Sequence, residues 1–184
     1  MYTNMWYKSD MVNTKSLAFM VVALPRSATT WVSNWLTTDK TLCLHDPLYT
    51  CKLEDLDSLK SEKLLGISCT AIFRFKEYLD NHPARKLVIH RDLGEINASL
   101  RDELGVNTFT EAQDEALYDI DGLHVTYNQL FDASFAKTMY EHLLEIPFDE
   151  ERYNYLVGLN IQPNFGTIKF DKEVLNDFRR RMAL

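Results

Sequence analysis

Residues 17–31 read LAFMVVALPRSATTW: an apolar run ends at Leu24, a short polar loop follows, and a helical pattern runs from Thr30 to Leu36. The uninterrupted apolar run predicts a strand buried on both faces. The first backbone N–H groups of the helix that follows have no partner within that helix, so they attract anions. Loop hydroxyls and the permanent charge of Arg26 add further donors. The segment predicts a phosphate-binding loop between a strand and a helix.

Simpler interpretations of this loop stay open. Ser27 or Thr29 could only cap the helix, with Arg26 a solvated surface charge. The sequence contains no Gly-Lys pair at this point, so the loop is not the Walker A loop of nucleotide kinases. The Rossmann glycine fingerprint is absent as well.

Strand-like segments alternate with helical ones along the rest of the chain. This alternation predicts an α/β fold with three layers, in which a mostly parallel central sheet carries helices on both faces. The carboxyl ends of parallel strands meet at one edge, where open sheets of this kind bind ligands. The expected strands are Leu17–Leu24, Leu42–His45, Leu64–Ser68, Leu87–His90 and Leu123–Thr126, and the expected helices after the first are Arg74–Asn81, Gly94–Leu104, Phe135–Leu144 and Asp149–Val157.

The loop resembles that of the sulfotransferases that use 3′-phosphoadenosine-5′-phosphosulfate (PAPS). Six of the seven residues of PRSATTW, residues 25–31, agree with that family's Pro-(Lys or Arg)-Ser-Gly-Thr-Thr-Trp, and the variant is most similar to that of carbohydrate and tyrosylprotein sulfotransferases. In the family this loop holds the 5′-phosphosulfate. The resemblance implies a fold similar to that of P-loop NTPases.

A second motif strengthens the resemblance. The strand-like segment Lys86–His90 ends at Arg91, and Ser99 follows eight residues later, as in the family's 3′-phosphate site, with Leu93 where proline is usual. An arginine at a strand end and a serine in the next helix can converge on one phosphate. The alternative is an ordinary strand-to-helix junction in which Arg91 pairs with a nearby aspartate.

Weaker similarities, at residues 42–49 and 124–130, extend the resemblance over about residues 17–162. We therefore expect residues 1–184 to form a single sulfotransferase-like domain. The first dozen residues and the tail Arg179–Arg181 show no such similarity. The tail is interpreted as a helix C-terminus, and contact with the 3′-phosphate is the alternative.

The resemblance implies transfer of a sulfuryl group from PAPS, without a metal, to a hydroxyl or amine of a small-molecule or glycan acceptor. Arg26 is expected to stabilise the leaving group. Asp46, which stands where related carbohydrate enzymes have a catalytic Glu, is the expected base, with His45 as second choice and His90 as third. The expected cofactor-binding residues are Pro25, Arg26, Ser27, Ala28, Thr29, Thr30 and Trp31 at the 5′ end and Arg91 and Ser99 at the 3′ end.

Ala28 departs from the family, which has glycine there. A positive φ at this position would strain an alanine, whereas a helical φ would leave it harmless. A catalytically inactive protein of the same fold, binding a nucleotide or a protein, is therefore the alternative function. A P-loop nucleotide kinase comes third, because it would need the missing lysine and a Mg²⁺-binding pattern.

Composition limits the remaining classes. A net charge of −7 argues against nucleic-acid binding. No apolar run is long enough to cross a bilayer and no signal peptide is evident, so a soluble, cytoplasmic protein without membrane contact is expected. Cys43, Cys51 and Cys69 match no zinc-binding spacing and are expected to be free thiols.

The acceptor site is expected to be shallow, because few residues separate the Ser99 helix from the last strand. Residues 111–121 hold five carboxylates and no cation, which indicates a solvated helix or loop or, alternatively, a lid on the acceptor side. Trp35, Phe109 and Tyr118 are candidate lining residues or, equally, core residues.

Overall fold

The computed structural model describes residues 17–104 and 109–159. Their centre is a five-stranded parallel sheet with the strand order β2-β3-β1-β4-β5. The strands are β1 (Leu17–Ala23), β2 (Thr41–His45), β3 (Leu64–Cys69), β4 (Arg85–His90) and β5 (Leu123–Thr126). The helices are α1 (Thr29–Trp35), α2 (Lys76–Asn81), α3 (Leu93–Leu104), α4 (Glu111–Tyr118), α5 (Ala133–Leu144) and α6 (Glu150–Val157), with short 3₁₀ segments η1 (Pro47–Tyr49), η2 (Leu53–Ser58), η3 (Ile72–Arg74) and η4 (Tyr127–Phe131).

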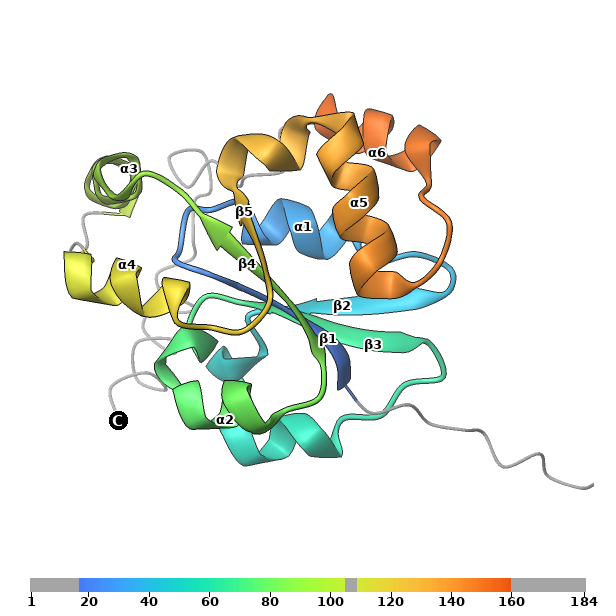
Figure 1. Ribbon diagram of the computed structural model, residues 1–184, viewed down its shortest axis with the longest axis horizontal. Helices are drawn as coiled ribbons and strands as arrows, with labels where there is room; N and C mark the ends of the chain where they lie inside the picture. The colour runs from blue at the N-terminus through green and yellow to red at the C-terminus, as the bar shows by residue number, and fades with distance from the viewer. Residues whose placement is uncertain (1–16, 105–108, 160–184) are drawn as a thin grey trace, which may run out of the picture.

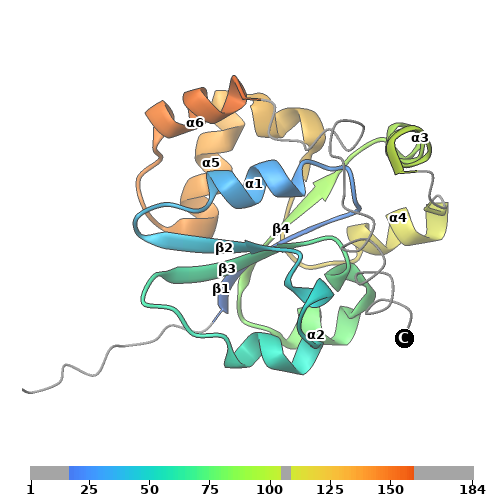
Figure 2. The ribbon, with the colours of Figure 1, turned by 180° about the vertical axis from the view of Figure 1, so that it is seen from behind.

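Helices cover both faces of the sheet, which confirms the predicted three-layer α/β class. Helices α1, α5 and α6 lie on one face, and α2 lies on the other with η2 (Figures 1 and 2). Each face buries its own apolar core. One contains Trp31, Trp35 and Tyr140, and the other contains Met20 and Ile67.

Strand β1 decides the topology because it lies at the centre of the sheet. It pairs with β3 on one side and with β4 on the other. The chain therefore adds β2 and β3 on one side of β1 and then β4 and β5 on the other side. In open parallel sheets a crevice forms at the carboxyl ends of the strands at such a point. The loop after β1 therefore lies where this fold binds ligands.

Close packing at the centre requires one small residue. Phe19 of β1 pairs with Gly66 of β3, and a Cβ built on Gly66 would lie 2.2 Å from the Phe19 ring. The Phe19 ring is fully buried, so it occupies the space that a side chain at residue 66 would need.

All five expected strands are present, with small differences at their ends. Strand β1 ends at Ala23, one residue before the expected end. Strand β4 starts at Arg85 and includes the buried Lys86, whose ammonium donates to the carbonyls of His82 and Ala84. Because these two carbonyls accept from its ammonium group, Lys86 can be buried within the strand, although the apolar pattern had predicted a strand that begins only at Leu87.

The expected helix Arg74–Asn81 is wrong in its first part. The chain forms η3, breaks at Phe75, and only then forms α2. The acidic segment forms helix α4 over Glu111–Tyr118, one of the two forms expected for a solvated segment, and its alternative role as a lid on the acceptor side stays a prediction. The tail Arg179–Arg181 lies outside the described residues. Among the helices of the described part, none has the length and apolar character needed to cross a membrane.

Candidate functional site

The loop between β1 and α1 adopts a conformation that favours glycine at two positions. Arg26 has φ 67° and Ala28 has φ 63°, both in the left-handed region. The first of the two possibilities for Ala28 therefore applies, and its backbone is strained by about 1–2 kcal/mol. The Ala28 methyl is 5% exposed and belongs to the core on the α1 face.

The two sequence motifs meet at the carboxyl edge of β1 and β4. The Arg26 Nε donates to Ser99 Oγ at 2.8 Å, although 73 residues separate them. The Arg91 Nη1 donates to the Arg26 carbonyl oxygen. Side chains from β4 and α3 thus contact the loop that follows β1.

Arg91 also has partners at the edge of the sheet. Its Nε donates to Glu95 Oε2 at 3.0 Å, one turn into α3. Its guanidinium carbon lies 4.3 Å from the centre of the Tyr127 ring, in η4 after β5. These contacts fix the guanidinium beside the loop. Glu95 and Tyr127 were not among the expected site residues, although helical spacing from Arg91 and a position just after a strand were signals for them.

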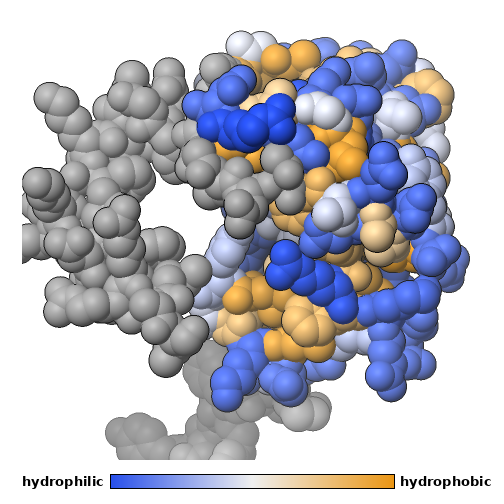
Figure 3. Space-filling model, turned by 90° about the vertical axis from the view of Figure 1, so that its left-hand side faces the viewer, coloured by the Kyte–Doolittle hydropathy of each residue, from blue (hydrophilic) through white to orange (hydrophobic). Residues whose placement is uncertain are grey.

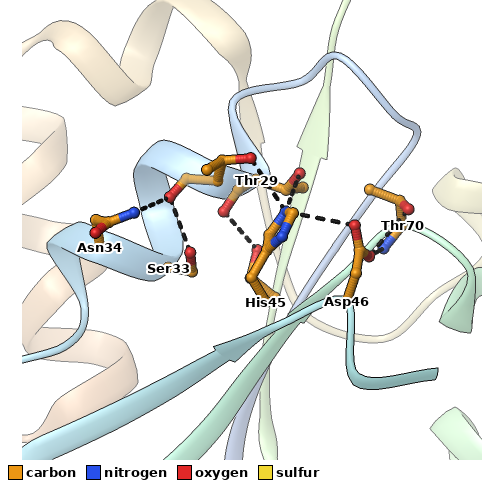
Figure 4. A network of polar contacts seen from close by, with 8 residues as sticks. Thr29, Ser33, Asn34, His45, Asp46 and Thr70 are labelled. Carbon is orange, nitrogen blue, oxygen red and sulfur yellow. Dashed lines mark hydrogen bonds and ion pairs between the residues drawn. The ribbon is translucent and has the colours of Figure 1, made fainter. Parts of the chain in front are cut away.

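The candidate bases His45 and Asp46 lie together because the chain bends between them. Adjacent strand residues point to opposite faces, but Asp46 has φ 45° and directly follows β2. The His45 Nε2 consequently lies 3.4 Å from Asp46 Oδ2 (Figure 4). The same nitrogen is 3.3 Å from Thr29 Oγ1 and 3.2 Å from Thr30 Oγ1.

Asp46 is held from the opposite side by Thr70, which directly follows β3. Its Oδ1 accepts hydrogen bonds from the Thr70 backbone N–H at 2.5 Å and from Thr70 Oγ1 at 3.0 Å. The Asp46 side chain is 9% exposed, whereas that of His45 is 35% exposed. The imidazole is therefore the more accessible group, and the carboxylate lies behind it. Thr70 was not among the expected residues, although it directly follows a strand.

His90 is buried at the end of β4 and bonded to a second imidazole. Its Nε2 lies 2.8 Å from His124 Nδ1. Burial, together with the neighbouring His124, lowers the pKa of His90 to about 4. His90 is therefore neutral near pH 7.

Two other loop residues are buried in the described structure. The Trp31 indole N–H donates to the Leu156 carbonyl at 3.0 Å, and its ring packs against Phe131 and Trp35. Ser27 is fully buried, and its hydroxyl has no hydrogen-bond partner among the described residues.

Burial decides between the two interpretations, lining residue or core residue, for Trp35, and it differs between Phe109 and Tyr118. Trp35 is fully buried, so it is a core residue and lines no surface site. Phe109 is partly buried against the core of the α2 face and packs on Phe73. Tyr118 is 61% exposed.

All three cysteines are free thiols, as expected. Burial raises the pKa of Cys69 to about 11 and raises that of Cys43 further. The pKa of Cys51 is also raised, by burial and by Asp55. Thiolate nucleophiles are therefore disfavoured at all three positions. Within residues 17–104 and 109–159, no group of three or more His, Cys, Asp or Glu side chains is placed to hold a metal ion.

Comparisons with known proteins find similarity of fold but not of sequence. No protein-family profile matches the sequence, and no curated protein matches it. The structure of mouse sulfotransferase SULT7A1 complexed with PAP is similar, with a TM-score of 0.48 and 11% sequence identity over 86% of this chain and 68% of that one. Values this low say nothing about activity, which depends on the side chains described above.

Proposed function

We propose that this chain binds PAPS and transfers its sulfuryl group to a hydroxyl or amine of a small acceptor. One observation carries the proposal: Arg26 and Ser99 are in contact, and Arg91 is bonded to the loop that contains Arg26. The two segments that resemble the two phosphate sites of sulfotransferases thus share one edge of the sheet. This arrangement supports the proposal that one nucleotide with phosphates at both ends binds along this edge.

Each end of the nucleotide has its own donors. Arg26, Thr29 and Thr30 would hold the 5′-phosphosulfate, and Arg91 with Ser99 would hold the 3′-phosphate. Ser27 supports this assignment, because a buried hydroxyl without a partner is costly unless a ligand supplies one. PAPS supplies an activated sulfuryl group with a nucleotide as its leaving group.

We assign the proton acceptor to His45 and give Asp46 a positioning role. The acceptor oxygen or nitrogen forms a bond to sulfur while the bond from sulfur to the nucleotide's phosphate oxygen breaks, and the acceptor's proton passes to the imidazole. The Asp46 carboxylate already accepts two hydrogen bonds from Thr70 and is more buried than the His45 imidazole. His45 is more exposed and lies beside the hydroxyls of Thr29 and Thr30. Arg26 stabilises the negative charge that develops on the departing oxygen, and it does so without giving up a proton.

Ligand-dependent unfolding tests the proposal. 3′-Phosphoadenosine-5′-phosphate (PAP) without metal should raise the melting temperature, because a ligand that binds only the folded state stabilises it. ATP with Mg²⁺ should raise it less. A shift seen only with ATP and Mg²⁺ would favour the kinase alternative, and no shift with either nucleotide would end the nucleotide proposal.

Turnover separates an active enzyme from an inactive member of the fold. Transfer of label from [³⁵S]PAPS to a mixture of small molecules and glycans should be detectable and should be lost in Arg26→Ala. His45→Gln should abolish transfer while PAP binding persists. Binding of PAP without transfer to any acceptor would support the inactive alternative, in which strain at Ala28 accompanies loss of catalysis.

A further inference from the structure

The surroundings of the His45 ring are fixed by hydrogen bonds at the end of β3. Ser68 of β3 pairs with His45, is fully buried, and donates its hydroxyl hydrogen to the Thr29 carbonyl at 3.0 Å. Thr70, two residues later, donates twice to Asp46 Oδ1. The Asp46 N–H donates to the Ser68 carbonyl at 2.8 Å. Thr29 and Asp46, which both contact the imidazole, are therefore tied to the same strand end.

These contacts decide which nitrogen of the neutral His45 ring carries the proton. Asp46 Oδ1 accepts both hydrogen bonds from Thr70, and Oδ2 faces the His45 Nε2 at 3.4 Å (Figure 4). A carboxylate oxygen can only accept, so it would repel the lone pair of an unprotonated Nε2. A proton on Nε2 replaces that repulsion with attraction. The nitrogen that stays unprotonated is then Nδ1.

The same proton sets the direction of the two loop hydroxyls. The His45 Nε2 lies 3.3 Å from Thr29 Oγ1 and 3.2 Å from Thr30 Oγ1. Because an N–H at Nε2 makes both oxygens acceptors toward the ring, the hydrogen of each hydroxyl is left for another partner. An anion in the loop needs donors, and this arrangement supplies two.

His45 is partly open at the edge of the sheet where β2 ends. Its side chain is 35% exposed, and its Nδ1 has no hydrogen-bond partner within the described part of the chain. In Figure 1 the carboxyl end of β4 points toward α3, and the side with α3 and α4 faces the viewer in Figure 3. Apolar patches lie there between strongly hydrophilic side chains.

We propose that Thr70 is a positioning residue: it acts through Asp46 to keep the proton of His45 on Nε2, so that Nδ1 takes the proton of the acceptor substrate. This inference rests on the proposed sulfuryl transfer. As the acceptor's oxygen or nitrogen bonds to sulfur, its bond to hydrogen breaks and the proton passes to Nδ1. The bond between sulfur and the nucleotide's phosphate oxygen breaks at the same time. The Asp46 carboxylate then stabilises the imidazolium.

Nitrogen NMR of the ligand-free, ¹⁵N-histidine-labelled chain measures the proton position without any turnover. Neutral His45 should show a protonated Nε2 and an unprotonated Nδ1, and His45→Gln identifies its signals. Asp46→Asn should move the proton to Nδ1. Thr70 would still donate to the amide oxygen, so the amide N–H₂ would face Nε2 and require an acceptor there. Asparagine tolerates the positive φ at this position, so the bend is kept.

Two variants of Thr70 test its role in turnover. Thr70→Val removes the hydroxyl that donates to Asp46, and Thr70→Ser keeps one. Because the carboxylate loses one of two charge-assisted hydrogen bonds, Thr70→Val should lower kcat about tenfold and change the Kd for PAP by less than about twofold. Its NMR spectrum should show a mixture of the two protonated forms of His45. Thr70→Ser should restore kcat and the single form.

Thr37→Val is the matched control. The Thr37 hydroxyl also makes two hydrogen bonds, to the Ser33 carbonyl and from the Cys43 N–H of β2, but it contacts neither His45 nor Asp46. Its loss should leave kcat and the His45 signals unchanged. Equal effects of Thr37→Val and Thr70→Val, or a Thr70→Ser variant as slow as Thr70→Val, would overturn the inference.

Failure of the proposed function gives a different result from failure of this inference. A wild-type chain that transfers no label from PAPS to any acceptor would end the proposed function, and the NMR spectrum would still decide where the His45 proton lies. A proton on Nδ1 in the wild type, or an unmoved proton in Asp46→Asn, would overturn the inference even where transfer continues.

Discussion

Replacing Arg91 by alanine tests whether the end of β4 holds a 3′-phosphate. The guanidinium already donates to the Arg26 carbonyl and to Glu95 and lies on the Tyr127 ring, so the structure holds it in place before any ligand binds. Charge-assisted hydrogen bonds to a phosphate contribute about 1.5–3 kcal/mol. Breaking the pair with Glu95, four residues further along the chain, offsets about 0.5 kcal/mol of that gain. The net loss in Arg91→Ala should be about 1–2.5 kcal/mol, or roughly 5- to 60-fold in Kd.

Calorimetric titration with two nucleotides measures this loss. PAP carries the 3′-phosphate and adenosine 5′-monophosphate lacks it, so Arg91→Ala should weaken PAP binding by the full factor. It should weaken binding of the monophosphate less, only through loss of the hydrogen bond to the Arg26 carbonyl in the 5′ loop. Arg91→Lys keeps the charge but loses the planar fork, and it should fall between wild type and alanine.

Arg85→Ala is the matched control. Arg85 lies at the other end of the same strand, where it pairs with Glu145 and donates to the Leu143 carbonyl. Its loss should leave the binding of both nucleotides unchanged. Equal weakening of PAP and the monophosphate by Arg91→Ala would refute the assignment of the 3′-phosphate to this end of β4.

Three further outcomes are expected. Gly66→Ala should destabilise the fold by about 1–3 kcal/mol in urea unfolding, because its methyl would overlap the buried Phe19 ring; an unchanged midpoint would contradict the packing described here. His90 has a pKa of about 4, below the ordinary 6.5, so only the unfolded state gains a proton as the pH falls through this interval. Wild type should therefore lose about 2–4 kcal/mol more stability between about pH 7 and pH 4 than His90→Gln, and parallel losses would show that His90 is not a buried neutral base. Ser27→Ala should leave unfolding of the free protein unchanged or slightly stabilised but should weaken PAP binding, because the hydroxyl has no partner among the described residues; a large loss of stability without ligand would assign Ser27 a structural role instead.

The central strands β1, β3 and β4 were predictable from sequence because each is a mostly apolar run buried on both faces. The edge strands β2 and β5 are shorter and alternate between more buried and more exposed residues. The order of the strands was not predictable, since it depends on which runs pack against β1 rather than on their composition. The same limit applies to the site. Its location at the carboxyl edge follows from residues that stand just after each strand, such as Arg91 and Asp46, but the contact between Arg26 and Ser99 depends on how β1 and β4 pair.

The contact between His45 and Asp46 could not be predicted from the alternation of side chains along a strand. Alternation along a strand places adjacent side chains on opposite faces, and one positive φ at Asp46 cancels that rule. Aspartate tolerates the left-handed region better than most residues, so the sequence allows a bend at Asp46 but does not predict one. Thr70 holds the bend by donating twice to the Asp46 carboxylate, and that pairing joins residues 24 apart in sequence.

Backbone strain gathers at the same edge as the candidate site. The described residues include four non-glycine positions with positive φ, and three of them, Arg26, Ala28 and Asp46, lie in the segments that come after β1 or β2. Such residues cost of order 1–3 kcal/mol each and persist where their surroundings hold them. Here the contacts that hold them come from other strands, through Arg91 on the Arg26 carbonyl and Thr70 on Asp46. A loop needed only to connect β1 to α1 could relax, whereas one whose donors must converge on an anion has to keep this shape. The strain therefore supports the ligand-binding role that we propose for this edge.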